Sequence, residues 1–358
     1  MEHAMNVVGM MSGTSLDGLD IALASFSGLD PIAYRILSTR HVPYEDSWNK
    51  RLSDALFSDA PTLVRLDDEY GAWLGHSVAN FLRDSGTEAD LIGSHGHTVF
   101  HRPAEGITLQ VGTGARIREQ SGVPVVCNFR QQDVRMGGQG APLVPAGDAL
   151  LFGEFDGCLN LGGFSNASWQ QDGHRYACDL APCNMLLNAL SAREGWEYDP
   201  EGSLARSGNV EAGLLQLWNE LSFYSQSPPK SLGREWFLEH FSAEVRDSRL
   251  ATRDLLRTAV EHIARQIDAF LSKVLPAGSS PPRVLCTGGG AHNLFLMERL
   301  HFLGRERLEY VIPDRELVDY KEALVFALLA YLRWHGRNNV LATVTGASSD
   351  HSSGDVYL

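Results

Sequence analysis

The sequence predicts an α/β protein built from two similar domains. Apolar segments of strand length alternate with longer segments of helical periodicity, which is typical of layered α/β folds. A strand, a turn rich in glycine and serine, and a second strand open the chain at residues 6–24. The same pattern returns at residues 158–169. This repetition indicates an internal duplication in which each domain begins with a β-hairpin.

The first half of the chain continues with a segment around Pro31 and Pro43 that we interpret as irregular. Residues 62–84 then carry apolar side chains at steps of three and four, which predicts a long helix. Three shorter elements follow: a strand at 91–95, a helix at 113–121 and a strand at 123–127.

The second half is predicted to add helices at 184–192 and 254–275, the latter strongly amphipathic. A proline-rich loop at 276–282 separates the long helix from a strand at 283–286. The last elements are an apolar helix at 322–335 and a tail, 348–355, that is expected to be loop. We place residues 1–127 and about 336–358 in domain I, and residues 128–335 in domain II.

The composition limits the possible partners. The chain has 358 residues, of which 44% are hydrophobic and 21% charged, as in soluble globular proteins. The net charge of −14 argues against binding to nucleic acid or to an anionic membrane. No apolar run approaches the ~20 residues of a membrane span, and no secretory signal is visible. Five cysteines without CxxC spacing suit reduced thiols, so we expect a cytoplasmic protein.

The turn at residues 11–18, MSGTSLDG, is the first candidate site. Exposed backbone N–H groups with serine and threonine hydroxyls beside them can hold phosphate oxygens. Asp17 can hold a hydrated divalent cation next to them. The turn lacks the lysine of a Walker loop, and a strand follows it where a helix would be expected. A plain hairpin turn is an equally good interpretation.

Two further turns of this type lie at strand ends, at residues 162–166 and 287–293. Three such turns on a duplicated chain suit a nucleotide held in a cleft between two domains. The glycines at 288–290 let the backbone approach a bulky ligand, and the next helix offers free N–H donors. A tight strand-to-helix turn alone would explain these glycines slightly better.

Asp179 ends an apolar strand, and Pro182 precedes the next helix. A carboxylate at a strand end that faces a phosphate site is where a kinase needs its base or its metal ligand. An acid at a helix entry is an equally good interpretation.

Residues 94–103 contain His95, His97 and His101. Zinc is disfavoured because no cysteine or carboxylate completes a ligand set nearby. In a strand His95 and His97 would share one face and could bond a polyhydroxylated ligand. Ordinary loop histidines with satisfied hydrogen bonds are the alternative.

Two charged residues complete the candidates. Arg130 can grip a carboxylate through two parallel hydrogen bonds, although a surface salt bridge is favoured without context. Glu322 begins the last predicted helix. It is either a ligand-facing acid or a first-turn acid that suits the helix dipole.

Seven motifs occur in one order along the chain: GMMSGTSLDGLD, SHGHTVFHRP, NFRQQDVRMGGQGAPLVP, NLGGFSN, PPKSLGRE, TGGGAHN and VTGA. This set, from about Gly9 to Ala347, resembles the anhydro-N-acetylmuramic acid kinases and the related levoglucosan kinases. The resemblance implies an actin/hexokinase-like (ribonuclease H-like) fold with an inter-domain cleft, ATP and Mg²⁺ as cofactors, and a homodimer. The implied enzyme opens the 1,6-anhydro bridge with water and phosphorylates the 6-oxygen, in cell-wall recycling.

The resemblance also implies roles for individual residues. Asp179 would be the general base, and Asp17 and Glu322 would be the metal ligands. The nucleotide would be bound by Gly13, Thr14, Ser15, Leu16, Asp17, Gly18, Leu19, Asp20, Gly162, Gly163, Asn184, Gly288, Gly289, Gly290 and Asn293. The sugar would be bound by His95, His97, Arg130 and Glu322.

The chain departs from the family pattern in one turn and at three further positions. The family usually reads DTGPGN where this chain has Asp179-Leu180-Ala181-Pro182-Cys183-Asn184, which predicts a changed phosphate contact. The family usually has Gln at His97, Asp at Asn128 and His near Asp148, which predicts a shifted sugar preference. Two alternatives therefore stay open: a kinase for another anhydrosugar such as levoglucosan, and a sensor that binds anhydrosugar or nucleotide without chemistry.

Overall fold

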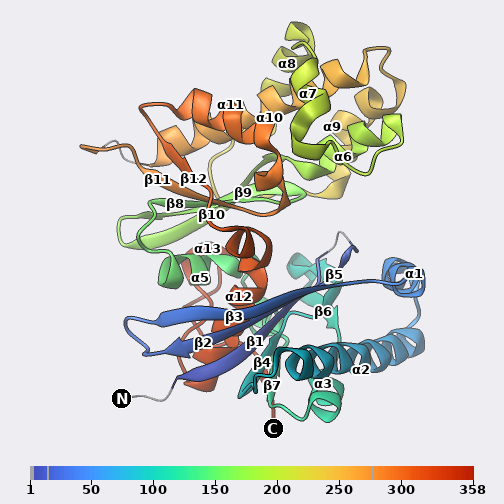
Figure 1. Cartoon of the computed structure of the whole chain (residues 1–358), viewed down its shortest axis with the longest axis vertical. Helices are drawn as coiled ribbons and strands as arrows, with labels where there is room; N and C mark the ends of the chain where they lie inside the picture. Colours follow the sequence, from blue (N-terminus) through green and yellow to red (C-terminus); the bar gives the residue numbers. More distant parts are fainter. Residues whose placement is uncertain (1–3, 14–15, 276–277) are drawn as a thin grey trace. The chain divides into compact units, whose positions relative to one another are not determined.

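The computed structural model describes residues 4–13, 16–275 and 278–358, and within these ranges the chain forms two compact units (Figure 1). Unit 1 contains the chain up to Phe152 together with Tyr320–Leu358, and unit 2 is Gly153–Asp319. These boundaries differ from the predicted ones at 127/128 and 335/336. They differ because the segment after residue 127 and most of the last long helix pack on the first sheet.

Both units are built on a mixed sheet of the same topology. In each, three consecutive strands pair antiparallel, and two later strands join in parallel on the other side of the first strand. The order is β13-β7-β4-β1-β2-β3 in unit 1 and β10-β9-β8-β11-β12 in unit 2. This order is the one expected of ribonuclease H-like domains, so the predicted α/β class and the internal duplication are confirmed.

The strands of unit 1 are β1 Met5–Met11, β2 Gly18–Ser27, β3 Ala33–Pro43, β4 Leu91–Ser94, β5 His97–Arg102, β6 Ile107–Val111, β7 Val125–Cys127 and β13 Asp355–Tyr357. The strands of unit 2 are β8 Gly157–Leu161, β9 Phe164–Gln171, β10 His174–Pro182, β11 Arg283–Thr287 and β12 Glu309–Val311. The two-stranded β5–β6 sheet is an excursion outside the repeated core.

The α-helices are α1 Asp46–Asp54, α2 Ala60–Ser85, α3 Gly114–Ser121, α4 Gln131–Arg135, α5 Val144–Leu151, α6 Asn184–Ser191, α7 Ser203–Ser207, α8 Ala212–Asn219, α9 Arg234–Asp247, α10 Thr252–Val274, α11 Leu294–Gly304, α12 Arg315–Trp334 and α13 Ala342–Thr345. None of the helices in the described ranges is long and apolar enough to cross a bilayer.

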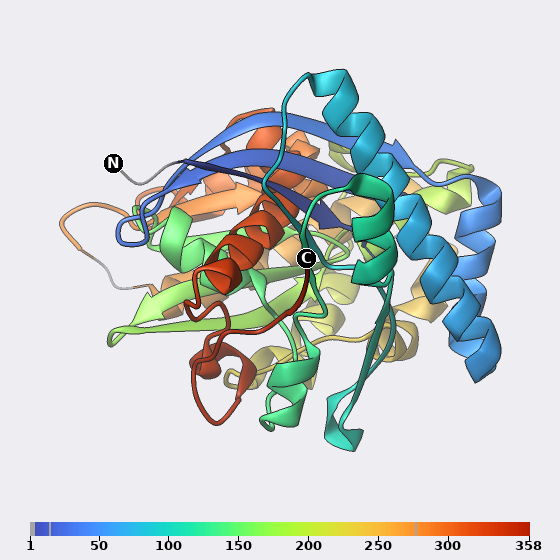
Figure 2. The ribbon, with the colours of Figure 1, turned by 90° about the horizontal axis from the view of Figure 1, so that it is seen from below.

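The two faces of the unit 1 sheet are covered by different helices. Val8 and Met10 of β1 lie in the core with the apolar face of α2, and α3 packs beside α2 (Figure 2). Gly9, between them, faces the opposite side, where a side chain would collide with the backbone of Ala323 in α12. The alternation of β1 therefore fixes one helix layer on each face.

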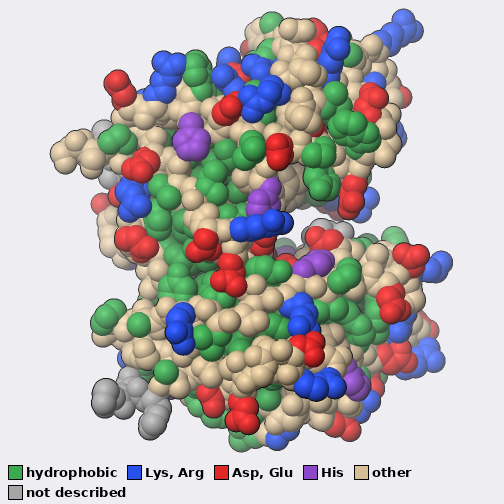
Figure 3. Space-filling model, viewed as in Figure 1, with side chains coloured by type: hydrophobic (Ala, Val, Ile, Leu, Met, Phe, Trp, Pro, Cys, Tyr) green, Lys and Arg blue, Asp and Glu red, His purple; other side chains and the backbone are tan. Residues whose placement is uncertain are grey.

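In unit 2, α10 supplies the main cover of the sheet. Its apolar stripe, which includes Leu256, Ile263 and Ile267, is fully buried among side chains from β8, β9 and β11. On the visible face of each unit, acidic and basic side chains are interspersed (Figure 3).

Two sequence predictions of elements were wrong. Residues 33–43 are not irregular but form β3, an edge strand whose alternating residues pair with β2. The last long helix begins at Arg315, well before residue 322, because the Asp314 side chain accepts a bond from Leu317 N (2.8 Å). The polar first turns of α12 hid this start from the apolar pattern.

Candidate active site

The turn between β1 and β2 is the predicted phosphate loop. Thr14 and Ser15 lie outside the described residues. Asp17 is exposed, and Leu16 has a positive φ of 58°. Leu19 places its side chain in the core (1% exposed), so only its backbone is left for a ligand. The described part of this turn thus presents the exposed Asp17 carboxylate next to Leu16, whose backbone is in the left-handed region.

Gly13 and Gly18 flank that turn; Gly18 begins β2, and Asp20 lies two residues further along this strand. Gly13 O accepts a bond from Leu16 N (3.5 Å), and Gly18 packs against Val42 and His41 of β3. Asp20 accepts a hydrogen bond from His41 Nδ1 (2.7 Å). The loop is therefore anchored to β3 on its C-terminal side.

His95 and His97 were expected on one face of one strand, and this is wrong. β4 ends at Ser94, Gly96 turns the chain with a φ of 71°, and His97 starts β5. Both histidines are buried, and burial lowers the pKa of His97 to about 4 and the pKa of His95 well below its usual range. Both rings are therefore neutral at pH 7.

The two nitrogens of His95 are already used. Nδ1–H donates to Gly96 O (2.9 Å), and Nε2 accepts from Nε and Nη2 of Arg130 (3.1 and 2.8 Å). Arg130 Nη1 also donates to Gly140 O (2.8 Å). His95 therefore holds the guanidinium in place, and it is Arg130 that has N–H groups left for a ligand.

Charged neighbours surround this arginine. Burial lowers the pKa of Arg130 to about 10, while Glu322 and Asp133 act in the opposite direction. Burial raises the pKa of Glu322, and Lys321 and Arg130 counteract this. Glu322 lies inside α12 and not in its first turn, so the helix-dipole interpretation does not apply. Unit 1 therefore brings together His95, Arg130 and Glu322.

In unit 2, Asp179 stands near the end of β10, at a bulge between residues 179 and 181. The segment around Leu232 holds it: Asp179 N donates to Lys230 O (3.1 Å), and Leu232 N donates to Asp179 Oδ2 (2.7 Å). Burial raises the pKa of Asp179 to about 6, and the bond from Leu232 acts against this. A carboxylate with this pKa is suited to accept a proton near neutral pH.

The altered turn after Asp179 uses its own backbone donors. Ala181 N donates to Ser165 Oγ (3.1 Å), Cys183 N to Gly163 O (2.8 Å) and Asn184 N to Gly162 O (3.1 Å). Leu180, Ala181 and Cys183 are buried. Each of these three amides therefore has a partner within unit 2.

The predicted nucleotide turns of unit 2 meet in space. Asn184 Nδ2 donates to Leu161 O (3.0 Å), just before Gly162. A side chain at Gly290 would contact Leu161 and Asn184, and Gly288 has a φ of 84° against Asn160. Gly163 and Gly289 are exposed beside them. Residues far apart in the sequence thus form one glycine-lined surface.

Asn293, predicted to bind the nucleotide, caps a helix in the structure. Its side chain accepts a bond from Leu296 N (2.9 Å), so it caps α11. His292 Nε2 pairs with Asp319 at the same turn (2.5 Å). The capping bond gives Asn293 a structural role that explains its presence without a nucleotide.

Comparison with known proteins matches the anhydro-N-acetylmuramic acid kinase family over residues 5–358. An anhydro-N-acetylmuramic acid kinase from Synechococcus elongatus is 36% identical over 99% of this chain and 99% of its own. One from Xanthomonas oryzae is 36% identical over 100% of this chain and 99% of its own. The chain belongs to the anhydro-N-acetylmuramic acid kinase family.

A solved structure with a similar fold is the activator of the 2-hydroxyisocaproyl-CoA dehydratase from Clostridium difficile with bound ADPNP. It has 10% identity and a TM-score of 0.45, and the match covers 91% of this chain and 94% of that one. This likeness is too distant to indicate a function.

Asn128 and Asp148, two of the positions where the resemblance predicts a departure from the family pattern, have their partners inside unit 1. Asp148 is buried and pairs with the buried Lys321 Nζ (3.0 Å). Asn128 adopts a φ of 60° and donates through Nδ2 to Gln131 Oε1 and Asp355 Oδ2, both at 2.8 Å. Each polar group that replaces the usual one therefore has a defined partner.

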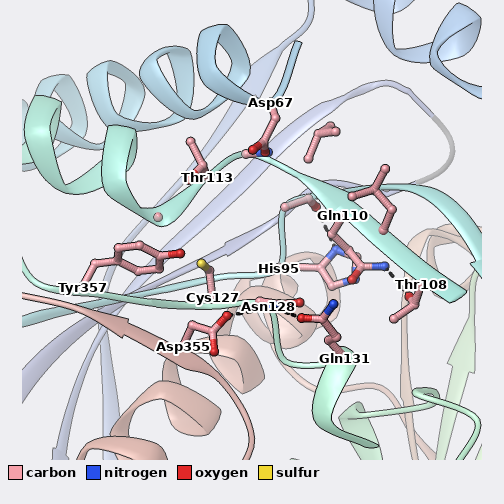
Figure 4. Close-up of a pocket in the computed structure, with 15 residues that line it drawn as sticks. Asp67, His95, Thr108, Gln110, Thr113, Cys127, Asn128, Gln131, Asp355 and Tyr357 are labelled. Atoms are coloured by element: carbon pink, nitrogen blue, oxygen red, sulfur yellow. Dashed lines mark hydrogen bonds between the residues drawn. The ribbon is translucent and has the colours of Figure 1, made fainter. Parts of the chain in front are cut away.

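Asn128 lines a cavity of about 160 Å³ that lies within unit 1 (Figure 4). Asp67, Gln110 and Asp355 also line it, and no lysine or arginine does among the described residues. The carboxylates of Asp67 and Asp355 would repel a carboxylate of a ligand there. The described lining of this cavity therefore offers no cationic side chain to a ligand carboxylate.

Several residues of the site were missed in the sequence. Lys230 and Leu232 act through their backbone, which leaves no trace in residue type. Asp133 is fully buried and bonds Gly140 N (2.6 Å) and Thr345 Oγ1 (2.7 Å), so it ties the GGQGAP segment to the VTGA motif. The spacing of these two motifs along the sequence gave no indication that they lie close together in the structure.

Proposed function

We propose that this protein is an ATP-dependent kinase that opens 1,6-anhydro-N-acetylmuramic acid and phosphorylates its 6-oxygen. Membership of the family over nearly the whole chain supports this, and the single structural observation that carries it is Asp179. Its carboxylate is held by a backbone N–H, and its pKa of about 6 suits a general base.

The reaction balances as follows. Water attacks the anomeric carbon and gives a proton to Asp179 while the bond from that carbon to the bridging oxygen breaks. The freed 6-oxygen forms a bond to the γ-phosphorus of ATP, and ADP leaves. The products are N-acetylmuramic acid 6-phosphate, ADP and the proton that Asp179 then releases.

The residues of unit 1 would bind the sugar. Arg130, pre-positioned by His95, pairs with the lactyl carboxylate, a group that levoglucosan lacks. Glu322, which interacts electrostatically with Arg130, is proposed to orient the sugar or the attacking water. In unit 2 the surface of Gly162, Gly163 and Gly288–Gly290 is proposed to bind the nucleotide.

Mg²⁺ needs only one or two carboxylates when phosphate oxygens and water complete its shell. The described part of the chain has no cluster of three or more metal-ligating side chains, so a cation here would depend on phosphate oxygens. Asp17, exposed on the phosphate loop, fits this requirement, and Glu322 is the second proposed ligand. The bound ion would neutralise phosphate charge. A homodimer remains a prediction of the family resemblance, and a cytoplasmic location remains a prediction from the cysteine pattern.

Sugar-dependent release of ADP tests the proposal. The purified chain is assayed with ATP and Mg²⁺ plus anhydro-N-acetylmuramic acid, levoglucosan or N-acetylmuramic acid. Turnover is expected with the first, and weaker turnover with the other two. Preference for levoglucosan would indicate the alternative kinase, and no sugar-dependent ADP would indicate a binding protein without chemistry.

A further inference from the structure

A chain of buried hydroxyl groups runs from the core of unit 1 to His97. Tyr70 OH lies 2.5 Å from Tyr44 OH, Tyr44 OH lies 2.7 Å from Ser12 Oγ, and Ser12 Oγ lies 3.2 Å from His97 Nδ1. The four residues come from α2, the segment after β3, the end of β1 and the start of β5. The proposed reaction uses none of these hydroxyl groups.

All four side chains are well shielded from solvent. Tyr70 is 0% exposed, Ser12 2%, His97 4% and Tyr44 8%. The Trp73 ring holds both tyrosine rings, since it stacks on Tyr70 (centroids 5.7 Å apart) and contacts Tyr44 (5.2 Å). The hydroxyl groups therefore have little freedom to change partners.

Burial of Tyr70 fixes the direction of this chain of bonds. If Tyr70 donates to Tyr44, then Tyr44 donates to Ser12, and Ser12 donates to His97 Nδ1. Among the described residues, Tyr44 is the one hydrogen-bond partner of the Tyr70 hydroxyl, and Ser12 Oγ has only Tyr44 and His97 as partners. The reverse direction, or a Ser12 that accepts from both neighbours, would therefore leave one buried hydroxyl proton without an acceptor, at a cost of about 1–3 kcal/mol. The forward direction is thus strongly favoured.

The consequence is a defined tautomer of His97. Nδ1 accepts from Ser12, so the single proton of the neutral ring sits on Nε2. In the described part of the chain no hydrogen bond to Nε2 is present. His97 is 4% exposed, and its Nε2 is not among the fully enclosed side-chain atoms without a partner, so this donor reaches the surface of unit 1, where a ligand acceptor can meet it.

We infer that His97 Nε2–H donates a hydrogen bond to an acceptor oxygen of the bound anhydrosugar, and that Ser12, Tyr44 and Tyr70 are positioning residues that set its tautomer. The inference rests on the proposed function and deepens it, because it assigns one donor-only contact in sugar recognition. A glutamine amide at position 97 would offer both a donor and an acceptor, so His97 makes recognition at this point stricter.

The same geometry changes the role of Ser12. Its hydroxyl accepts from Tyr44 and donates to His97, so it faces inward and is not a phosphate ligand. Ser12 nevertheless belongs to the phosphate loop. It therefore links the loop that is proposed to bind ATP to a residue that is proposed to bind the sugar.

Kinetics and NMR of matched variants test this. Tyr44→Phe and Ser12→Ala each break the chain of bonds, and each is expected to raise KM for anhydro-N-acetylmuramic acid about 3–10-fold, the worth of one hydrogen bond. KM for ATP and kcat should change less than twofold. Ser12→Thr, which keeps the hydroxyl, should restore the sugar KM. Tyr176→Phe, a hydroxyl deletion in unit 2, is the control.

The ¹⁵N spectrum of histidine-labelled protein gives a readout that does not depend on turnover. His97, assigned by its loss in His97→Gln, should show the Nε2–H form in the wild type and a mixture of tautomers in Tyr44→Phe. An Nδ1–H form in the wild type would overturn the inference, as would an unchanged sugar KM in folded Tyr44→Phe and Ser12→Ala. Because the tautomer is read without substrate, a failure of the proposed kinase activity would be seen separately, in the wild-type assay.

Discussion

The first hairpin of unit 1 and the first hairpin of unit 2 occupy the same place in the same sheet topology, but their turns are built differently. The β1–β2 turn is long, carries the exposed Asp17 and sends Ser12 inward to His97. The β8–β9 turn has only Gly162 and Gly163, and their carbonyl groups accept bonds from Cys183 and Asn184. A duplicated scaffold can therefore give one unit a turn with side-chain chemistry and the other a turn supported entirely by backbone.

The buried carboxylates show the same difference. In unit 2, Asp179 accepts one backbone hydrogen bond and forms no ion pair with the described residues, and burial raises its pKa to about 6. In unit 1, Glu322 stands among charges of both signs, including Lys321, Arg130 and Asp148. The first environment suits proton transfer, and the second suits binding and orientation.

Neutralising each carboxylate in turn tests whether Asp179 and Glu322 have different roles, and the largest effect is expected here. Asp179→Asn should lower kcat by ~10²–10⁴ with little change in binding, because an amide cannot take the proton from water. Glu322→Gln should act mainly on KM for the sugar. Glu154→Gln, an exposed acid of unit 2, is the control. If Asp179→Asn keeps most of its turnover, Asp179 is not the base.

A glycine-to-alanine pair tests how closely the two hairpins are covered. Gly9→Ala should lower the free energy of unfolding by about 1–3 kcal/mol, because the new methyl group meets the backbone of Ala323. Gly163→Ala should change it by less than ~0.5 kcal/mol, since only Met185 Cε lies near, at 4.0 Å. Urea unfolding measures both. Equal effects would mean that the two hairpins are equally covered.

The pH profile sharpens the contrast between the carboxylates. The base must be ionised, so kcat/KM for the sugar should fall as the pH drops below the pKa of about 6 that burial gives Asp179. Well below that pKa the loss approaches tenfold per pH unit, as for a single ionisation. Stopped assays between pH 4.5 and 8 measure it. An acid limb at the ordinary aspartate pKa would contradict the described environment.

The smallest expected effect concerns Asn293, predicted to bind nucleotide and found as a helix cap. Asn293→Ala should cost about 1 kcal/mol of stability, whereas Asn293→Asp should keep the cap. KM for ATP should change little, even in the variant that loses stability. A large rise in KM for ATP without loss of stability would return Asn293 to the nucleotide site.

Much of this architecture follows from local sequence patterns. The apolar periodicity of α2 and α10 and the repeated strand-turn-strand at 158–169 were enough to predict two similar α/β domains. Asp179 was predicted as a candidate base because a carboxylate after an apolar strand can be recognised from adjacent residues. These predictions depend only on residues that are neighbours in sequence.

The missed features depend on residues far apart in sequence. The buried chain of hydrogen bonds joins Ser12, Tyr44, Tyr70 and His97. These residues meet only because α2 packs against β1 and the β5–β6 sheet lies beside α2. Leu232 holds Asp179 through a backbone N–H, which every residue except proline has. The start of α12 at Arg315 was missed because the polar first turns of this helix carry no apolar pattern.

Attack of water on the anomeric carbon, with transfer of the phosphoryl group to the freed 6-oxygen, can be followed directly in H₂¹⁸O. Products are quenched early and examined by mass spectrometry. The account predicts one ¹⁸O on the anomeric carbon of the sugar phosphate and none in the phosphoryl group. Label in free phosphate, with no labelled sugar phosphate, would contradict it and show a protein that only hydrolyses ATP.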